Sequence, residues 1–251
     1  MTTAILSALP EEQAGLAGHL QGLRTQVHAG REFHLGHWNG HAVVFVLSRI
    51  GKVAAATTAA TLIERFGASR LFFTGLAGGL GPQVRVGDTV IGTEYLQHDM
   101  DASPLFARHE VPLYGRARFA ADAASAALLL ASAQALPAGG GIDPAVRQRF
   151  GLGTASRLHQ GLIVSGDRFV CRADEAHALR AALPDALAVD MEAAAVAQVC
   201  HDHGAPFAAI RHISDRADDQ AHVDFPAYLA QVAALQARAL IGALLDRLAQ
   251  A

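Results

Sequence analysis

The chain has 251 residues, of which 51% are hydrophobic and 17% charged, and its formal net charge is −3. This composition supports a large buried core and argues against an intrinsically disordered chain. It also lacks the surplus of basic residues that is typical of nucleic-acid-binding proteins, so we expect no nucleic-acid partner.

The sequence also bears on where the protein resides. It has no run of about 18 uninterrupted apolar residues, so we expect no membrane span. The first residues, MTTAILSALPEEQ, have no basic region and soon become acidic, which is not typical of a secretion signal. Cys171 and Cys200 have neither a CxxC nor a zinc-type spacing. These features favour a cytoplasmic protein with reduced thiols.

The first predicted element is a buried strand at residues 3–9, a short apolar run that ends before Pro10. Pro10 and the two acidic residues after it favour a helix over residues 10–20. An Asn-Gly pair between two apolar runs predicts a hairpin over residues 32–47. The pattern then predicts a helix at 50–66, a strand at 70–75, a glycine-rich turn at 76–81 and a strand at 84–96.

Residues 98–118 have no regular period, and a long irregular segment in a compact domain is usually functional. An alanine-rich helix is expected at 119–136 and a loop at 137–144. The remaining elements are strands at 158–166, 186–190 and 207–214, and helices at 173–183, 192–204 and 225–250. This mixed order of strands and helices predicts an α/β fold, a three-layer sandwich with a central mixed, twisted β-sheet flanked by helices. Because no repeat or linker interrupts it, we expect one domain over residues 1–251.

Acidic residues or glycines follow four of the predicted strands. These residues are Glu11 and Glu12, the glycines of 75–79, Asp190 and Glu192, and Ser214 and Asp215. Ligands of α/β sheets bind at the carboxyl ends of strands, so we expect Glu192 to lie in a cleft. The alternative is that Glu192 only stabilises the first turn of its helix, where the helix dipole favours negative charge.

Several familiar motifs are absent. The stretch GLAGGLG at 75–81 matches neither the dinucleotide-binding pattern nor the P-loop, so its glycines either admit a ligand close to the backbone or form a plain turn. Ser165 lacks the preceding glycine of a hydrolase elbow. The histidines include no H-E-x-x-H motif, and the stretch HDH at 201–203 is more typical of a solvated helix end. We therefore expect no metal site.

Eight stretches occur in an order and spacing that are specific in combination, although each alone is weak. They are ALPEE, SRIGKVAAA, TGLAGGL, VRVGDTVI, HDMDAS, GLIVSGDRFV, VDMEAAAVAQVC and IRHISDRAD. These stretches are distributed along nearly the whole chain, and in them the sequence resembles the 5′-methylthioadenosine/S-adenosylhomocysteine nucleosidases of the purine nucleoside phosphorylase superfamily. The resemblance implies a nucleoside phosphorylase-like fold, a small nucleoside as substrate, a homodimer and no cofactor.

The resemblance also implies roles for individual residues. Glu12 corresponds to the carboxylate that activates the attacking water, Arg211 to the basic residue near that water, and Asp215 to the acid that protonates N7 of adenine. The substrate-binding positions are Glu192 and Met191 at the ribose, Phe169, Val170 and Ser214 at the base, Ile50 and Phe225 at the 5′ end, and Gly78 in the glycine-rich segment.

Carboxylates suit this reaction for a physical reason. Breaking an N-glycosidic bond requires protonation of a poor leaving group, stabilisation of a cationic sugar and a supply of water, and carboxylates serve all three in different environments. We predict that burial raises the pKa of Asp215, whereas Glu12 and Glu192 stay ionised beside Arg211.

Three positions depart from the family pattern. Leu76 stands where many members have serine, and Arg49 and His212 replace small residues. The resemblance still implies a hydrolase that releases adenine from 5′-methylthioadenosine, S-adenosylhomocysteine or a related 5′-modified adenosine. Two alternatives among enzymes are a phosphorolytic nucleoside phosphorylase and a hydrolase of another nucleoside such as futalosine. A third alternative is a non-catalytic nucleoside-binding protein.

The resemblance further implies that residues 98–118 close the 5′ pocket of a partner subunit. Four apolar residues of that segment support this expectation, because exposed apolar patches usually have a partner. They are Leu105, Phe106, Val111 and Leu113.

Overall fold

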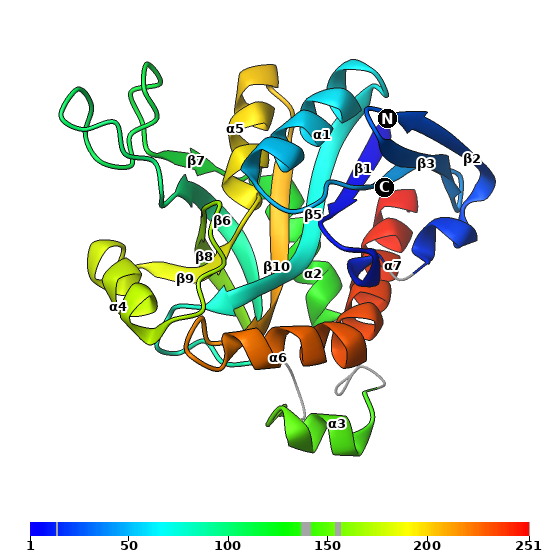
Figure 1. The fold of residues 1–251 in the computed structure, drawn as a ribbon. Helices are drawn as coiled ribbons and strands as arrows, with labels where there is room; N and C mark the ends of the chain where they lie inside the picture. Colours follow the sequence, from blue (N-terminus) through cyan, green and yellow to red (C-terminus); the bar gives the residue numbers. More distant parts are fainter. Residues whose placement is uncertain (14, 137–141, 154–156, 251) are drawn as a thin grey trace.

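The computed structural model describes residues 1–13, 15–136, 142–153 and 157–250. Its strands form one mixed sheet in the order β10-β6-β8-β9-β5-β1-β4-β3-β2, and β7 pairs with β6. An additional pairing between β10 and β5 closes five of these strands into a ring. Helices cover both faces of the sheet, so the predicted three-layer α/β architecture is confirmed (Figure 1).

The elements alternate along the chain much as the sequence predicts. The strands are β1 Thr2–Ser7, β2 Gln21–His28, β3 Arg31–Trp38, β4 His41–Leu47, β5 Ala68–Gly79, β6 Thr89–Gln97, β7 Arg118–Ala120, β8 Leu158–Ser165, β9 Ala186–Asp190 and β10 Phe207–Asp215. The helices are α1 Lys52–Glu64, α2 Ala123–Gln134, α3 Pro144–Arg149, α4 Ala173–Ala182, α5 Ala193–His203, α6 Ala221–Tyr228 and α7 Ala234–Ala249, with short 3₁₀ helices η1 Pro10–Glu12 and η2 Leu16–His19 and a π-helical turn η3 Leu229–Ala233.

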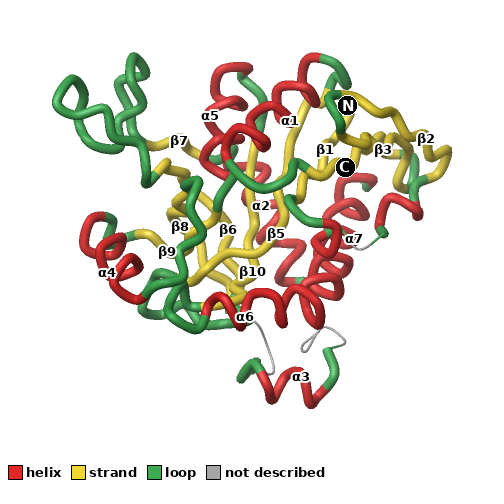
Figure 2. The backbone as a smooth tube through the Cα atoms, viewed as in Figure 1, coloured by secondary structure: helices red, strands yellow, loops and turns green. Residues whose placement is uncertain are grey.

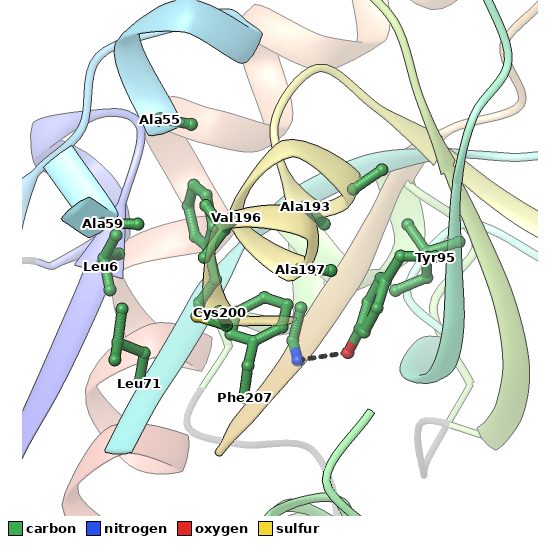
Figure 3. Packing of buried hydrophobic residues seen from close by; sticks show 14 of the residues in the cluster. Leu6, Ala55, Ala59, Leu71, Tyr95, Ala193, Val196, Ala197, Cys200 and Phe207 are labelled. Atoms are coloured by element: carbon green, nitrogen blue, oxygen red, sulfur yellow. Dashed lines mark hydrogen bonds between the residues drawn. The ribbon is translucent and has the colours of Figure 1, made fainter. Parts of the chain in front are cut away.

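The sheet has an apolar core on each face. On one face, α1 and α5 present small residues, among them Ala55, Ala59 and Ala197, to Leu6 and other strand residues (Figure 3). Small side chains let these helices lie close to the strands, so the site at the beginning of α5 is held against a rigid support. The opposite core is formed by α2 and α7 with Ile5, Phe72 and Ile210.

The segment Asp224–Ala249 is the only described helix long and apolar enough to cross a membrane. Its apolar residues have a place in the core, since Leu240, Ile241, Leu244 and Leu245 are fully buried on the sheet face shared with α2. Core packing therefore accounts for the composition of this helix. It continues without a break from α6 through the π-helical turn, so it begins four residues earlier than the predicted helix at 225–250.

Residues 10–20 do not form the predicted helix. Two short 3₁₀ helices replace it, because Gly15 adopts a left-handed backbone with φ 72° between them. The next element, β2, is a strand that the sequence did not predict. Almost all of its side chains are exposed, so it shows no alternation of apolar and polar residues.

The predicted glycine turn at 76–81 is also wrong, because β5 continues through Gly79 and pairs there with β9. The predicted strand at 84–96 begins only at Thr89. The predicted helix at 119–136 is preceded by the short strand β7 and is limited to α2. Of the predicted loop at 137–144, residues 137–141 lie outside the described part of the chain, and Pro144 begins the short helix α3.

Residues 98–118 are irregular, as predicted. They form loops that extend beyond β7, away from the rest of the molecule (Figures 1 and 2). Val111 and Arg116 form an isolated bridge within them. Leu105 and Leu113 are strongly exposed, at 84% and 90%. Val111, in contrast, is buried in the core beside Phe119, so it is not part of an exposed patch.

Candidate active site

A cavity of ≈ 390 Å³ lies at the carboxyl ends of β5, β9 and β10. This is the edge of the sheet at which the sequence places the candidate site. All the predicted site residues line the cavity except Ser214 and Arg211, which are buried and donate hydrogen bonds to the lining residues Asp215 and Asp190. The lining residues are Ala8, Leu9, Glu12, Ile50, Leu76, Ala77, Gly78, Arg168, Phe169, Val170, Val189, Asp190, Met191, Glu192, Asp215 and Phe225.

Glu12 is held at one end of the cavity by backbone donors. Its Oε2 accepts hydrogen bonds from the N–H groups of Ala8, at 2.8 Å, and Leu9, at 2.9 Å. Its Oε1 accepts one from the N–H of Leu76, at 3.0 Å. The carboxylate is almost fully buried, with 4% of the residue exposed. Its orientation therefore depends on the turn after β1 and on the end of β5.

Arg211, on β10, lies beside Glu12 and is fully buried. A Cβ atom at Gly75 would be 2.8 Å from Glu12 Oε1 and 2.9 Å from Arg211 Nη1, so any other residue at this position would separate the two groups. The guanidinium also stacks on Phe73, 4.2 Å from the ring centroid. Glycine is therefore needed at position 75, because the side chains of Glu12 and Arg211 occupy the space that a Cβ atom would fill.

Asp190 is the direct partner of Arg211. Arg211 Nε donates to Asp190 Oδ2 at 2.7 Å, and both side chains are 1% exposed. Asp190 also accepts hydrogen bonds from the N–H groups of Glu192 and Ala193 at the start of α5, and from the hydroxyl of Ser165. The remaining donors of Arg211, Nη1 and Nη2, have no hydrogen-bond partner among the described residues.

Glu192 faces the cavity and does not cap its own helix. No side-chain cap bond is present at this N-terminus, where Asp190 accepts the N–H groups instead. Glu192 Oε1 accepts a hydrogen bond from Gly51 N–H at 3.0 Å, and its Oε2 lies 3.9 Å from Arg211 Nη2. The arrangement favours the cleft hypothesis over helix capping.

Ionisation at this end of the cavity differs from the prediction. Burial, followed by the charge of Asp190, raises the pKa of Glu192 to about 8, and Arg211 only partly offsets this effect. Burial also raises the pKa of Glu12, against the lowering effects of Arg211 and three backbone N–H groups. The expectation that Glu192 stays ionised beside Arg211 is therefore wrong, because three buried carboxyl groups share one cation.

Asp215 lies at the end of β10 with a different set of neighbours. Ser214 Oγ donates to its Oδ2 at 2.7 Å, and Ala217 N–H donates to its Oδ1 at 2.8 Å. No ion pair to Asp215 exists among the described residues, so burial dominates and raises its pKa, as predicted. Gly78 permits this placement, since a Cβ atom there would be 2.9 Å from Ala217 Cβ and 3.0 Å from Asp215 Oδ1.

The rest of the cavity wall is mainly apolar. Phe169 and Phe225 meet edge to face, with ring centroids 5.6 Å apart. Ile50 is 52% exposed and Phe169 40% exposed, which places both at the mouth of the cavity. A flat aromatic face, an apolar rim and four carboxyl groups in one cavity suit a ligand with a planar base, a polar sugar and an apolar substituent.

Comparison with known proteins agrees with this geometry. The profile described as the phosphorylase superfamily matches residues 2–246. A 5′-methylthioadenosine/S-adenosylhomocysteine nucleosidase of Hydrogenovibrio crunogenus is 37% identical, over 96% of this chain and 97% of that protein.

The chain belongs to the phosphorylase superfamily. Within it, the resemblance to the 5′-methylthioadenosine/S-adenosylhomocysteine nucleosidases is confirmed. The nucleosidase of Neisseria meningitidis, solved with methylthio-immucillin-A, has a TM-score of 0.84 at 35% identity, covering 98% of this chain and 99% of that one. A futalosine hydrolase variant of Helicobacter pylori has a TM-score of 0.84 at 26% identity, covering 98% of this chain and 99% of that one.

The three residues that depart from the nucleosidase pattern, Leu76, His212 and Arg49, each have defined contacts in the structure. The side chain of Leu76 packs against Tyr228, Val232 and Ala233, while its N–H still binds Glu12. His212 bonds through Nδ1 to Thr89 Oγ1 at 2.9 Å, and burial, followed by Arg211, lowers its pKa to about 4. It is therefore neutral near pH 7. Arg49 is exposed and donates to the carbonyl of Gly30, outside the cavity.

Sequence reasoning missed several residues of the site. Asp190 was noted as an acid at a strand end, but not as the partner of Arg211. The close approach at Gly75 and the hydrogen bond from Gly51 N–H to Glu192 were also missed. The described residues contain no cluster of three or more His, Cys, Asp or Glu suited to a metal ion.

Proposed function

We propose that this protein hydrolyses the N-glycosidic bond of 5′-methylthioadenosine, S-adenosylhomocysteine or a closely related 5′-modified adenosine and releases adenine. The observation that carries this proposal is the placement of Glu12, Glu192 and Asp215 on one cavity, each in a different environment. The similarity to nucleosidases over nearly the full chain supports the same activity.

In this proposal, the Asp215 end of the cavity receives the base. Asp215 has a raised pKa, so it holds a proton that it can donate to N7 of adenine as the glycosidic bond breaks. Ser214 keeps the carboxyl group oriented through its hydroxyl. Phe169 stacks on the purine ring, and the backbone of Val170 reads its edge.

The other end of the cavity receives the sugar and the attacking water. Glu12 accepts a proton from the water, and Arg211 keeps enough positive charge nearby for the Glu12 carboxylate to form. Glu192 binds the ribose hydroxyls, with Met191 against the sugar. Because positive charge develops on the ribose, ionisation of Glu192 becomes more favourable in the transition state than in the empty site. Ile50 and Phe225 cover the 5′ substituent.

Water is a better acceptor than phosphate in this cavity. A phosphate dianion needs several converging donors, whereas the only cationic residue among the described lining residues is Arg168, which is paired with Glu175. Arg211 is fully buried, does not line the cavity and already balances the charge of Asp190, and Glu12 would repel an anion. Leu76 adds no hydroxyl donor.

The test is a product assay on purified enzyme with a panel of nucleosides. We expect 5′-methylthioadenosine to release adenine at full rate in phosphate-free buffer, with a free 5′-methylthioribose as the second product. A rate that rises in proportion to added phosphate, with a phosphorylated sugar, would identify a phosphorylase. Turnover of futalosine alone would identify the other hydrolase, and binding without product would identify a nucleoside-binding protein.

We further propose that the protein acts as a homodimer in the cytoplasm, with residues 1–251 as one domain. Leu105 and Leu113 on the projecting loops and Val53 at the start of α1 are exposed apolar side chains that a second copy would cover. Both cysteines are free thiols, which suits a reducing compartment. Sedimentation at micromolar concentration should give a dimer mass, and replacing Leu105 and Leu113 with Ser should shift it toward the monomer. A fully active monomer would contradict this arrangement.

A further inference from the structure

A second depression lies next to the proposed nucleoside cavity. It has a volume of ≈ 560 Å³ and shares Ala8, Leu9 and Ile50 with the cavity, so the two lie side by side at the end of the cavity that we assign to the 5′ substituent. Its remaining lining residues come from η1, from the turn before β3, from β3 itself, and from the end of β4 and the segment after it. They are Pro10, Gly30, Arg31, Glu32, His34, Leu47 and Arg49.

The depression is lined by two arginines and by one carboxylate, Glu32, so its charged side chains carry a net positive charge. Arg31 donates to the carbonyls of Ala29, Ser48 and Ala54, and Arg49 donates to the carbonyl of Gly30. Among the described residues, neither guanidinium has a carboxylate within ion-pair distance. The neighbouring carboxylate of Glu32 lies 3.8 Å from Nε2 of His34. Partial burial and the neighbouring charge of Arg49 lower the pKa of Arg31, which is a sign that the two cations lie close together.

The backbone holds Arg49 in this position. Its φ is 68°, in the left-handed region that is uncommon for residues with a Cβ atom, and it directly precedes Ile50 at the cavity mouth. The hydrogen bond to Gly30 directs the guanidinium toward the β2–β3 turn. Within the described part of the chain, its guanidinium donates to one carbonyl, so several N–H groups remain for an anion.

We propose that this depression is a subsite for a carboxylate at the end of an extended 5′ substituent, with Arg49 as the residue that determines specificity. The inference rests on the proposed function and deepens it. A 5′ substituent passes Ile50 and reaches the two guanidinium groups, which a methylthio group is too short to do. The enzyme should therefore prefer acid-bearing 5′ substituents to neutral ones of equal length.

A matched pair of substrates tests this preference. We would compare kcat/KM for 5′-S-(3-carboxypropyl)thioadenosine and 5′-S-butylthioadenosine, whose tails have the same carbon chain and differ in whether it ends in a carboxylate or a methyl group. For the wild-type protein, we expect the acid to be favoured by about three- to tenfold, as for an exposed charge-assisted pair. The preference should fall as salt is added, because exposed charges are screened.

Substitutions then assign the preference to a residue. Arg49→Met should reduce the ratio to about one, and Arg49→Lys should restore part of it. Arg65→Met is the matched control, since Arg65 is exposed at the end of α1 and lines neither depression, and it should keep the wild-type ratio.

The outcomes separate the two proposals. Release of adenine from both substrates with equal efficiency would overturn the carboxylate subsite and leave the proposed hydrolase intact. A preference for the acid that survives in Arg49→Met would overturn the role of Arg49. Failure of the wild-type protein to release adenine from either substrate, or from 5′-methylthioadenosine, would instead contradict the proposed function itself.

Discussion

The two ends of the cavity solve the problem of buried charge in opposite ways. At one end, Glu12, Asp190 and Glu192 surround a single cation, Arg211. Backbone N–H groups donate hydrogen bonds to these carboxyl groups and so reduce their mutual repulsion. At the other end, the partners of Asp215 among the described residues are a hydroxyl and a backbone N–H. A carboxyl group is thus placed beside a cation at one end of the cavity, whereas at the other end the same type of group has no cation and retains a proton.

The largest expected effect is at the end without a cation. Asp215→Asn should lower the turnover number by about 10²- to 10⁴-fold, because the amide keeps the shape and hydrogen bonds of the side chain but cannot donate a proton to the base. Binding of a nucleoside analogue should be largely retained. Adenine release under saturating substrate measures the loss.

The control for that variant is Asp219→Asn, a nearby exposed aspartate that does not line the cavity. It should leave adenine release at the wild-type rate. Near-normal turnover by Asp215→Asn would show that the proton comes from another group, and the contrast between the two ends would lose its functional meaning.

At the end that shares a cation, the expected effect is on stability as well as activity. Arg211→Met should lower the free energy of unfolding by about 3–5 kcal/mol, because it leaves buried carboxylates without their partner. Urea unfolding at pH 7 measures this loss. The double variant Arg211→Met/Asp190→Asn should recover part of it, since the substitutions lie on one ion pair. Independent, additive effects would indicate that the pair is not coupled.

A smaller effect concerns the pH dependence of stability. The pKa of Glu192 is about 8 in the folded protein, above the ordinary value of 4.5, so between these values the folded chain holds a proton that the unfolded chain releases. This group therefore makes stability fall as the pH rises through that window, by up to about 1.4 kcal/mol per pH unit. Glu192→Gln should remove its share of the slope.

Urea unfolding of wild-type and variant protein between pH 5 and 8, at roughly half-unit intervals, measures the difference between the two slopes. Glu11→Gln removes a carboxylate at the neighbouring exposed position to Glu12 and serves as the control for a simple change in net charge. Parallel curves for wild type and Glu192→Gln would mean that the shared cation already compensates Glu192 fully, in conflict with the contrast between the two ends.

Much of the fold could be predicted because local patterns determine it. The apolar runs of β1, β9 and β10 and the turn at Asn39 gave correct strands. The missed elements lack such a local signal: β2 has almost no buried face, and Gly15 divides residues 10–20 through its backbone conformation alone.

For the site, motifs located the carboxyl groups but not their interactions. The hydrogen bond from Gly51 to Glu192 spans 141 residues, and no local period contains information on such a contact. The pairing of Asp190 with Arg211 and the close approach at Gly75 likewise arise only when β5, β9 and β10 come together. The charge balance of three carboxyl groups around one arginine, and hence the raised pKa of Glu192, depends on that packing.

The glycines of β5 have one further consequence, for the size of the ligand. Gly75 lies beside Glu12 and Arg211, and Gly78 lies beside Asp215, three residues farther along the same strand. At a rise of about 3.3 Å per residue, the backbone separates these two positions by about 10 Å. β5 pairs with β1 and β10 over most of its length, so this separation is a fixed dimension of the sheet. A single-residue insertion or deletion between Gly75 and Gly78 would change it by about 3.3 Å, and one molecule could then no longer reach both ends at once.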